Sequence, residues 1–378
     1  MSRLRAMRRS ARVALVLALA LAGAVTSSLA ADATHAPPTP RPPAAQVLPG
    51  HALQFPRDYG SHPEFRTEWW YVTGWITTVA GETLGFQVTF FRTRPDQVDV
   101  SNPSAFTPRQ IMIAHAAISD RSRGRLWKSQ RVARAGFGLA GASETDTAAR
   151  LDGWVLERID GAYQARIAAE DFGFELTLAT TQPPMLNGVG GYSQKGPEPK
   201  SASYYYSEPG LRVVGSVVRQ GKREPVTGEA WLDHEWSSAY LDTQATGWDW
   251  IGLNLEDGGA LMAFRIRDRD GATRWAGGTL RRGDGTQQSF RPEEIVFEPG
   301  RRWRSPRSGV EYPIEFVVRA GALRIALEPL MDDQESDTRA STGAIYWEGA
   351  VEAKTEERGM IGSGYLELTG YGAPLELP

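Results

Sequence analysis

Short runs of apolar residues that alternate with polar ones fill the chain from about residue 68 onward. Representative runs are EWWYVTGWITT (68–78), TLGFQVTFFRT (83–93), WVLERI (154–159), YQARIAA (163–169) and FGFELTLAT (172–180). A period of two places successive side chains on opposite faces of a β-strand. No window of 12 or more residues beyond the amino-terminal segment keeps an apolar stripe at helical spacing. The pattern therefore predicts an all-β protein.

The turns between these runs predict antiparallel hairpins. Asp-Gly pairs, which favour the left-handed backbone of tight hairpin turns, recur at Asp160-Gly161, Asp257-Gly258, Asp270-Gly271 and Asp284-Gly285. The roughly 20 strands are too many for one small barrel. We expect two β units, 51–240 and 241–378, with the Pro- and Gly-rich stretch 182–200 as a long loop inside the first unit.

The amino terminus has the composition of a secretory signal peptide. Five arginines precede an apolar run from Val13 to Val25, and small residues follow at Ser28 and Ala30. The run is shorter than the roughly 20 residues that cross a bilayer. We expect residues 1–30 to be removed by cleavage after Ala30, 31–50 to form a disordered Pro- and Ala-rich tether, and the mature protein to be periplasmic or secreted, with no transmembrane segment.

Charge and cysteine content narrow the function. The 378 residues include 42 Lys+Arg and 45 Asp+Glu, and removing the five amino-terminal arginines leaves 37 basic residues against 45 acidic ones, a net charge of −8. An acidic exported chain is a poor candidate for binding nucleic acid. The absence of cysteine from the sequence excludes disulfides, thiolate metal sites and cysteine nucleophiles.

Common catalytic motifs are missing from the sequence. The chain contains no GxSxG, no HExxH and no Walker loop. The stretch 136–141 fits GxGxxG, but the residues after it offer no helix on which a pyrophosphate could dock. The histidines are too dispersed to predict a metal site from their spacing, so the sequence predicts no metal and no cofactor.

Two segments combine aromatic and ionisable residues. In the segment 68–75, strand alternation places Trp69, Tyr71 and Trp75 on one face and Trp70 on the other.

In the segment 231–236, the same rule places His234 with Trp236, opposite Trp231, Asp233 and Glu235. Two interpretations stay open for His234: a titratable group in a binding site, or a hydrogen-bonded histidine in a barrel core. In Trp248-Asp249-Trp250, the favoured interpretation is that both tryptophans lie in the core and that Asp249 points outward.

Five stretches carry a family resemblance: HPEFRTEWWYVTGWI (62–76), WLDHEWSS (231–238), GWDWIGLNLEDG (247–258), YWEGAV (346–351) and GYLELTGY (364–371). They resemble the carotenoid 1,2-hydratases (hydroxyneurosporene synthases, CrtC) and the AttH-like secreted proteins, over nearly all of 51–375. The resemblance implies two lipocalin-like antiparallel β-barrels in tandem. It also implies cofactor-free addition of water across a terminal isoprenoid double bond.

The resemblance also implies site residues. His234 and Trp236 match the His-x-Trp pair of the hydratases. Their Tyr-x-Asp pair has two candidate positions here, because Tyr240-Leu241-Asp242 has the pattern whereas Asp249 has flanking indoles instead.

Indole faces stabilise a carbocation, so we assign substrate binding to Trp69, Tyr71, Trp75, Trp248 and Trp250. If the last strand of the first barrel closes against the first strand, His234 is expected in a pocket beside Trp69 or Tyr71.

Two functions follow. The first is cofactor-free, acid-catalysed hydration, or related chemistry at a carbon–carbon double bond, of an apolar isoprenoid or lipid-like substrate. The alternative is a non-catalytic periplasmic carrier of a hydrophobic ligand, which needs no acid. The expected partner is an apolar small molecule. An encounter with a membrane surface or with the export machinery is compatible with either function. The sequence does not predict the oligomeric state.

Overall fold

The computed structural model describes residues 41–99 and 101–375, all within one compact unit. The predicted signal peptide, 1–30, and the first part of the predicted tether, 31–40, lie outside these residues. Helix in the described part of the chain is limited to two short 3-10 turns, η1 (Arg57–Tyr59) and η2 (Pro292–Glu294). None of its helices is of a length and hydropathy that would cross a bilayer. The predicted all-β fold is confirmed.

Sheet A contains 13 antiparallel strands and bends into a nearly closed barrel, with β4 at one end in contact with β5 at the other. The strand order is β4-β3-β2-β1-β13-β12-β9-β8-β7-β6-β5, and both β10 and β11 pair with β12. The strands are β1 (Thr67–Thr78), β2 (Thr83–Thr93), β3 (Ile111–Ser119), β4 (Trp127–Arg134), β5 (Ala140–Ala142), β6 (Ala148–Leu151), β7 (Trp154–Ile159), β8 (Ala162–Ala168), β9 (Phe172–Ala179), β10 (Met185–Leu186), β11 (Tyr192–Gln194), β12 (Ala202–Arg219) and β13 (Lys222–Ala239).

Sheet B contains ten strands in the order β17-β16-β15-β14-β25-β24-β22-β21-β18, with β23 paired to β24, and β19 and β20 form a separate ribbon. The strands are β14 (Gly247–Leu255), β15 (Ala260–Arg267), β16 (Thr273–Arg281), β17 (Gln287–Phe290), β18 (Ile295–Pro299), β19 (Arg302–Arg304), β20 (Glu311–Pro313), β21 (Phe316–Ala320), β22 (Leu323–Pro329), β23 (Glu335–Thr338), β24 (Ala344–Thr355) and β25 (Gly359–Leu368). The tandem lipocalin-like architecture is therefore confirmed. The division into domains 51–240 and 241–378 stays a prediction.

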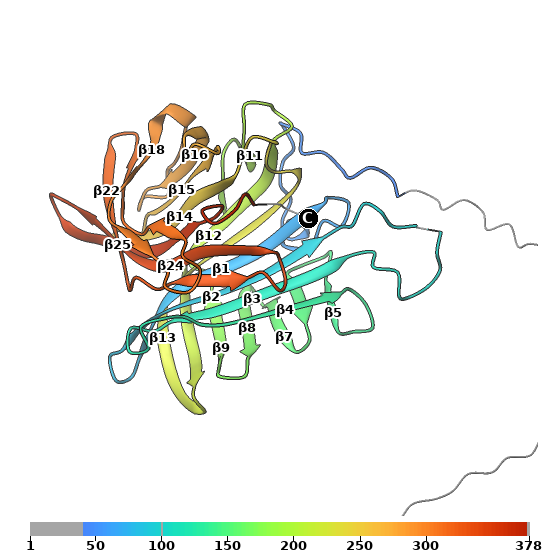
Figure 1. The fold of residues 1–378 in the computed structure, drawn as a ribbon, viewed down its shortest axis with the longest axis horizontal. Helices are drawn as coiled ribbons and strands as arrows, with labels where there is room; N and C mark the ends of the chain where they lie inside the picture. The colour runs from blue at the N-terminus through green and yellow to red at the C-terminus, as the bar shows by residue number, and fades with distance from the viewer. Residues whose placement is uncertain (1–40, 100, 376–378) are drawn as a thin grey trace, which may run out of the picture. The chain divides into compact units, whose positions relative to one another are not determined.

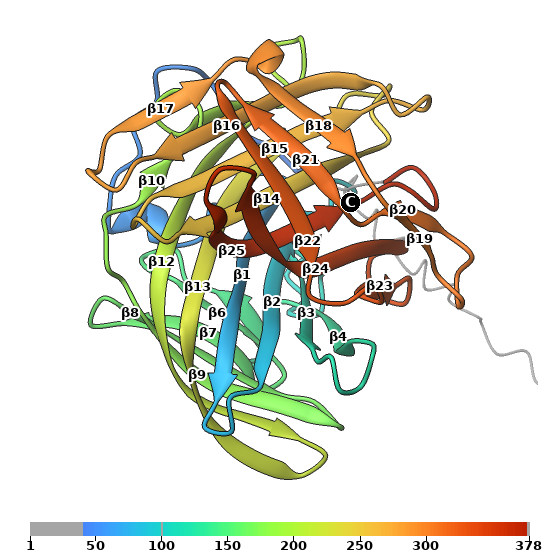
Figure 2. The ribbon, with the colours of Figure 1, turned by 90° about the vertical axis from the view of Figure 1, so that its left-hand side faces the viewer.

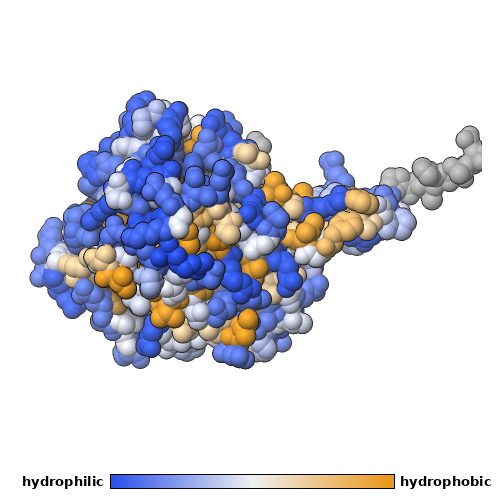
Figure 3. All heavy atoms as spheres, turned by 90° about the horizontal axis from the view of Figure 1, so that it is seen from below, coloured by the Kyte–Doolittle hydropathy of each residue, from blue (hydrophilic) through white to orange (hydrophobic). Residues whose placement is uncertain are grey.

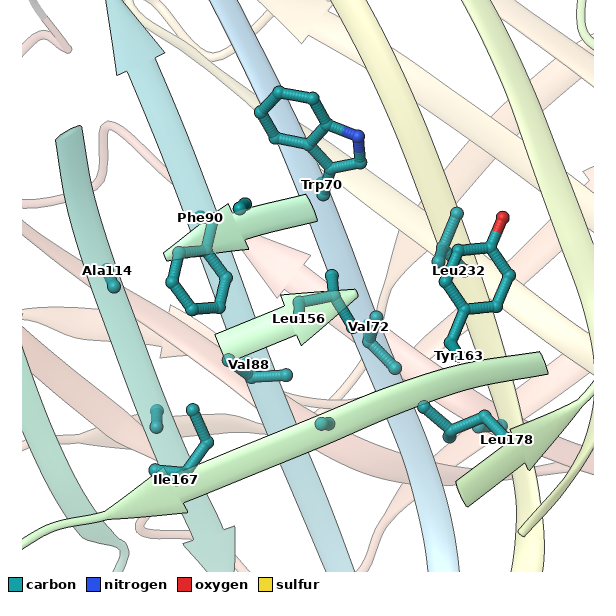
Figure 4. Close-up of a cluster of buried hydrophobic side chains, with 14 of the residues drawn as sticks. Trp70, Val72, Val88, Phe90, Ala114, Leu156, Tyr163, Ile167, Leu178 and Leu232 are labelled. Carbon is teal, nitrogen blue, oxygen red and sulfur yellow. The ribbon is translucent and has the colours of Figure 1, made fainter. Parts of the chain in front are cut away.

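Every second side chain of β1 and β2 points into the first barrel and helps to fill it. Trp70 and Val72 on β1 point inward with Val88 and Phe90 on β2, and all four are fully buried. Figure 4 shows these side chains packed together with residues from strands on the other side of the barrel. Because the inward face of each strand is occupied in this way, the outward face of β1 is free to contact sheet B.

The two sheets pack against each other through β1 and β2 of sheet A and β24 and β25 of sheet B (Figures 1 and 2). Gly85 on β2 allows a close approach, since a Cβ at this position would lie 2.8 Å from Ala350 Cβ and 2.6 Å from the Tyr365 hydroxyl. The Trp75 indole N–H donates to the Gly364 carbonyl at 2.9 Å. The outer face of β1 and β2 is therefore an internal interface.

Residues 41–50 differ from the predicted disordered tether. Val47 is buried, the Ala45 amide donates to the Glu64 carbonyl at 2.9 Å, and the Leu48 amide donates to the Tyr204 hydroxyl at 3.0 Å. This stretch has no apolar periodicity, but one valine and a few backbone groups find partners on sheet A. Packing therefore begins several residues before His51.

Candidate active site

A cavity of about 100 Å³ lies between the outward face of sheet A and sheet B. This volume accommodates several heavy atoms. Its walls include eight aromatic residues and four carboxyl groups: Trp69, Tyr71, Phe91, Tyr205, Tyr240, Trp248, Trp250, Tyr346, Asp233, Glu235, Glu348 and Glu367. The cavity therefore combines an apolar lining with titratable groups supplied by both sheets.

The register of β1 and β13 determines which residues of sheet A face this cavity. Trp69 lies opposite Glu235, and Tyr71 lies opposite Asp233. Directly opposed residues on paired strands share a face. The face of β13 that carries the two acids is therefore turned toward sheet B, together with the aromatic residues of β1.

Asp233 is held by three donors. Its carboxylate accepts from the Tyr205 hydroxyl at 2.6 Å, the Ser207 hydroxyl at 2.5 Å and the Trp231 indole N–H at 2.7 Å. Burial raises the pKa of Asp233 to about 7, although these hydrogen bonds act to lower it. Its oxygens are thus occupied by the protein itself.

Glu235 pairs with the buried Lys195, whose ammonium lies 2.9 Å from its carboxylate, and it also accepts from the Ser203 hydroxyl. Burial raises the pKa of Glu235 and lowers the pKa of Lys195, and their mutual attraction opposes both shifts. The wall formed by sheet A therefore contains an ion pair.

Glu348 and Glu367 form a different arrangement on sheet B. They lie directly opposite each other on β24 and β25. Glu348 accepts from the Gln87 side chain, and Glu367 accepts from the Trp248 indole N–H at 2.8 Å. Burial raises the pKa of both carboxyl groups, that of Glu367 to about 7. Repulsion from Glu367 raises the pKa of Glu348 further, and repulsion from Asp233 and Glu235 acts on Glu367 in the same way.

One oxygen of this pair lies beside the Tyr71 hydroxyl. Interaction with this hydroxyl lowers the pKa of Glu348, although burial raises it overall, and the Glu348 carboxylate raises the pKa of Tyr71. Glu348 Oε1 and the Tyr71 hydroxyl are buried, belong to residues that line the cavity and have no other hydrogen-bond partner within residues 41–99 and 101–375. Buried polar atoms of this kind commonly bind water or a ligand.

His115 on β3 adds a neutral imidazole to the cavity. Its Nδ1 lies 3.0 Å from the Tyr346 hydroxyl and its Nε2 lies 2.9 Å from Ser341 Oγ. Burial lowers the pKa of His115 to about 3. His115 is thus uncharged at neutral pH.

Five of the residues proposed from the sequence line the cavity: Trp69, Tyr71, Tyr240, Trp248 and Trp250. Trp75 instead lies at the contact between the sheets described above. Asp242 is partly exposed and pairs with Arg274 at 2.6 Å.

Asp249 lies on the opposite face of β14 from the cavity. The expected outward orientation is wrong, because Asp249 is fully buried, with Arg265 at 2.5 Å and Arg267 at 3.0 Å. The paired arginines supply the charge that allows a carboxylate to lie inside the second barrel.

His234 and Trp236 lie inside the first barrel. The expected pairing of β1 with β13 is correct, but the position beside Trp69 or Tyr71 is wrong. The register places Trp70 opposite His234, and the two rings stack with centroids 4.6 Å apart. A catalytic role for His234 and Trp236 stays a prediction.

His234 belongs to a buried charge cluster with Asp58, His62, Glu68 and Arg92. Glu68 Oε1 lies 2.7 Å from His62 Nδ1 and 2.9 Å from His234 Nε2, and Glu68 Oε2 accepts from Arg92 Nε at 2.7 Å. His62 Nε2 lies 3.1 Å from Asp58. Burial opposes protonation of His62, but hydrogen bonds to the two carboxylates outweigh it and raise its pKa.

The donor atoms of His62, Glu68 and His234 lie within 4.8 Å of one another, and this donor set suits zinc or iron. In this cluster, however, Arg92 already pairs with Glu68, and hydrogen bonds to Asp58 and Glu68 favour the charged form of His62. We assign the cluster a structural role, which is to fix the segment before β1 to the barrel. The cluster could not be predicted from residue spacing, because His234 lies far from its other members in the sequence.

Glu348 and Glu367 were not proposed from the sequence. Each is a single acid inside an otherwise apolar strand, in YWEGAV (346–351) and GYLELTGY (364–371). An acid in such a run is rarely buried without a function or a partner. That feature is the signal that could have found them.

The AttH-like family matches residues 46–371. The crystal structure of a Nitrosomonas europaea protein assigned as an AttH is 52% identical over 86% of this chain and 99% of that chain, with a TM-score of 0.82. Kievitone hydratase from Nectria haematococca shares the fold, with a TM-score of 0.65 at 14% identity over 89% of this chain and 98% of that chain. No curated protein matches the chain significantly.

Proposed function

The chain belongs to the AttH-like family, and we propose that it catalyses acid-dependent addition of water to a carbon–carbon double bond of an apolar, isoprenoid or lipid-like substrate. The observation that carries this proposal is the pair Glu348 and Glu367 facing an aromatic cavity. The fold that the chain shares with kievitone hydratase is compatible with it.

The acid pair supplies the first requirement of the reaction, a proton donor. Two buried carboxyl groups on neighbouring strands resist losing both protons, so the pair keeps a proton at neutral pH. Glu348 is the donor in this proposal because its Oε1 has no partner in the described part of the chain other than the Tyr71 hydroxyl beside it.

The aromatic walls supply the second requirement, a shielded place for positive charge. Protonation of one alkene carbon breaks the π bond and leaves a carbocation at the other carbon. Each aromatic face stabilises a nearby cation by about 0.5–2 kcal/mol. Trp69, Tyr71, Trp248 and Trp250 surround the cavity from both sheets.

Water completes the addition. Its oxygen bonds to the cationic carbon and its surplus proton passes to the carboxylate left on the acid pair, so the enzyme returns to its starting state. We assign this water to the Tyr71 hydroxyl, which is buried beside Glu348 and belongs to a residue that lines the cavity. No other reactant is needed.

Carriage of a hydrophobic ligand is the second candidate, favoured by the aromatic lining of the cavity. A carrier needs the aromatic walls but not the acid pair. The two functions therefore differ in what happens to the ligand and in their dependence on Glu348.

Incubation with linear isoprenoids and unsaturated fatty acids in ¹⁸O-labelled water tests the proposal. We expect at least one product that contains the label, which mass spectrometry detects. Glu348→Gln is expected to abolish its formation, whereas the matched control Glu352→Gln, on the same strand and paired with Lys354 outside the cavity, is expected to retain it. A ligand that binds tightly and is recovered unlabelled contradicts hydration and supports carriage.

We also propose that the protein works outside the cytoplasm, on the basis of the signal-peptide pattern in residues 1–30. Mass spectrometry of the exported protein is expected to show a chain that begins at Ala31. Retention of residues 1–30 in a membrane fraction contradicts this.

A further inference from the structure

Four large apolar side chains are exposed at one end of the first barrel. Phe106 in the loop between β2 and β3 is 64% exposed, Val132 on β4 is 52% exposed, and Phe137 and Leu139 in the loop before β5 are 56% and 62% exposed. Figure 3 shows apolar residues (orange) at several places on this face, some of them near the right-hand protrusion. Exposed apolar side chains grouped in this way indicate an interaction site.

The two phenylalanine side chains form one cluster around Arg134. The rings of Phe106 and Phe137 lie 5.2 Å apart, and the Arg134 guanidinium lies 4.5 Å from the first ring and 5.2 Å from the second. We call Phe106, Val132, Arg134, Phe137 and Leu139 the apolar patch. Its members come from three segments that contact each other.

The charge around the apolar patch is locally positive. Arg41 donates to the Arg109 carbonyl at 2.7 Å, and Arg109 donates in turn to the Asn102 carbonyl of the loop. Neither these two arginines nor Arg134 forms a salt bridge in the described part of the chain. Three acids lie in or next to these segments. Asp96 pairs with Arg66, the Asp99 carboxylate accepts from Ser101, and Asp152, whose amide donates to the Leu139 carbonyl, lies 3.5 Å from Arg131.

Arginines beside exposed aromatic and aliphatic side chains are complementary to an anionic lipid surface. The rings and Leu139 enter the boundary between headgroups and acyl chains, while the guanidinium groups meet the lipid phosphates. The chain as a whole is acidic, so this attraction is confined to the patch.

The apolar patch is continuous with the cavity. Val132 lies directly opposite Ile113 in the pairing of β3 and β4, so the two side chains share the outward face of sheet A. Ile113 lines the cavity. A ligand that leaves a bilayer at the patch thus meets apolar side chains on its way to the acid pair.

We propose that the apolar patch is a docking surface for anionic phospholipid membranes, from which the protein takes its apolar ligand. Only the uptake of the apolar ligand from the membrane rests on the proposed function. Membrane docking stands on the exposure, the clustering and the charge of the patch residues.

Co-sedimentation with vesicles of phosphatidylglycerol and phosphatidylcholine tests docking without a substrate. We expect the mature chain to bind these vesicles, to bind pure phosphatidylcholine more weakly, and to dissociate as salt is raised. The double variant Phe106→Ser, Phe137→Ser is expected to lose binding by about tenfold or more. Arg134→Gln is expected to weaken binding to the anionic vesicles only.

Val79→Ser is the matched control, because Val79 is 82% exposed in the hairpin between β1 and β2, away from the patch. It should bind as the unmodified protein does. Equal vesicle binding by the double variant overturns the proposal. The proposal is also overturned if the unmodified protein is a dimer and the double variant is a monomer, because the patch is then a contact between two copies of the chain. None of these measurements depends on turnover. The docking proposal can therefore be refuted without refuting hydration, and hydration can be refuted without refuting docking.

Discussion

Glu348 on β24 and Glu367 on β25 lie directly opposite each other, so that two carboxyl groups share one face of a hairpin beside an aromatic cavity. Protons bound to such a pair belong to both members. The charge of Glu367 therefore raises the pKa of Glu348.

The pH dependence of turnover should report this coupling. Because the acid must be protonated to react, we expect the rate to fall as pH rises through the raised pKa of the pair. Glu367→Gln removes the neighbouring negative charge and lowers the pKa of Glu348, so the fall should move to lower pH. Glu352→Gln should leave the midpoint unchanged. An unmoved midpoint in Glu367→Gln contradicts the coupling.

Loss of the proton donor should affect catalysis more than binding. General acids contribute about 10²–10⁴-fold to a rate, so we expect Glu348→Gln to lower kcat by about this factor. Ligand affinity, measured by tryptophan fluorescence, should change little because the amide keeps the shape of the side chain. A matching loss of affinity would mean that Glu348 binds the ligand and does not protonate it.

The stability of the protein should decrease with rising pH because of the same pair. Both pKa values are raised in the folded state, so the folded protein holds more protons than the unfolded chain above the ordinary value of 4.5. This contribution is fully present below pH 4.5 and is lost as pH rises through the raised pKa values. The double variant Glu348→Gln, Glu367→Gln should show a smaller drop in Tm between about pH 5 and about pH 8 than the parent chain. An equal drop excludes this pair as its source.

His234→Ala should act mainly on stability. The imidazole lies inside the first barrel and contacts Glu68, so its removal leaves a buried acceptor short of a donor, at a cost of about 1–3 kcal/mol. We expect a lower Tm with ligand binding retained by the folded fraction. Loss of turnover at an unchanged Tm would restore the catalytic role that the family resemblance implies for His234.

Gly85→Val should disturb the contact between the two sheets. Its side chain would meet Ala350 and the Tyr365 hydroxyl, and overpacking of this kind costs about 1–3 kcal/mol. Since the cavity lies in the same interface, ligand affinity should fall together with Tm. A crystal structure of the variant with an unmoved sheet B would contradict this expectation.

Strand alternation was sufficient to predict which residues of one strand share a face. It placed Trp69 with Tyr71, and Asp233 with Glu235, as the cavity has them. It did not predict which face meets the second barrel. In a tandem barrel both faces of β1 and β13 are buried and aromatic, so hydropathy does not distinguish them.

The acid pair could not be predicted from the residue pattern of any single strand. Glu348 and Glu367 become neighbours only through the register of β24 and β25, and they reach Trp69 only through packing between the sheets. Asp249 shows the converse: its flanking indoles resemble a site, but pairing with Arg265 and Arg267 from β15 makes it structural.

The position of the acid pair in the last hairpin has a consequence for biosynthesis. All 13 strands of sheet A are translated before either carboxyl group exists. A chain that is still emerging, or one cut by a protease just ahead of β24, contains the strands of the first barrel and all of the aromatic lining except Tyr346. It lacks Glu348, so the proposed reaction becomes possible only when the carboxyl-terminal hairpin folds into place.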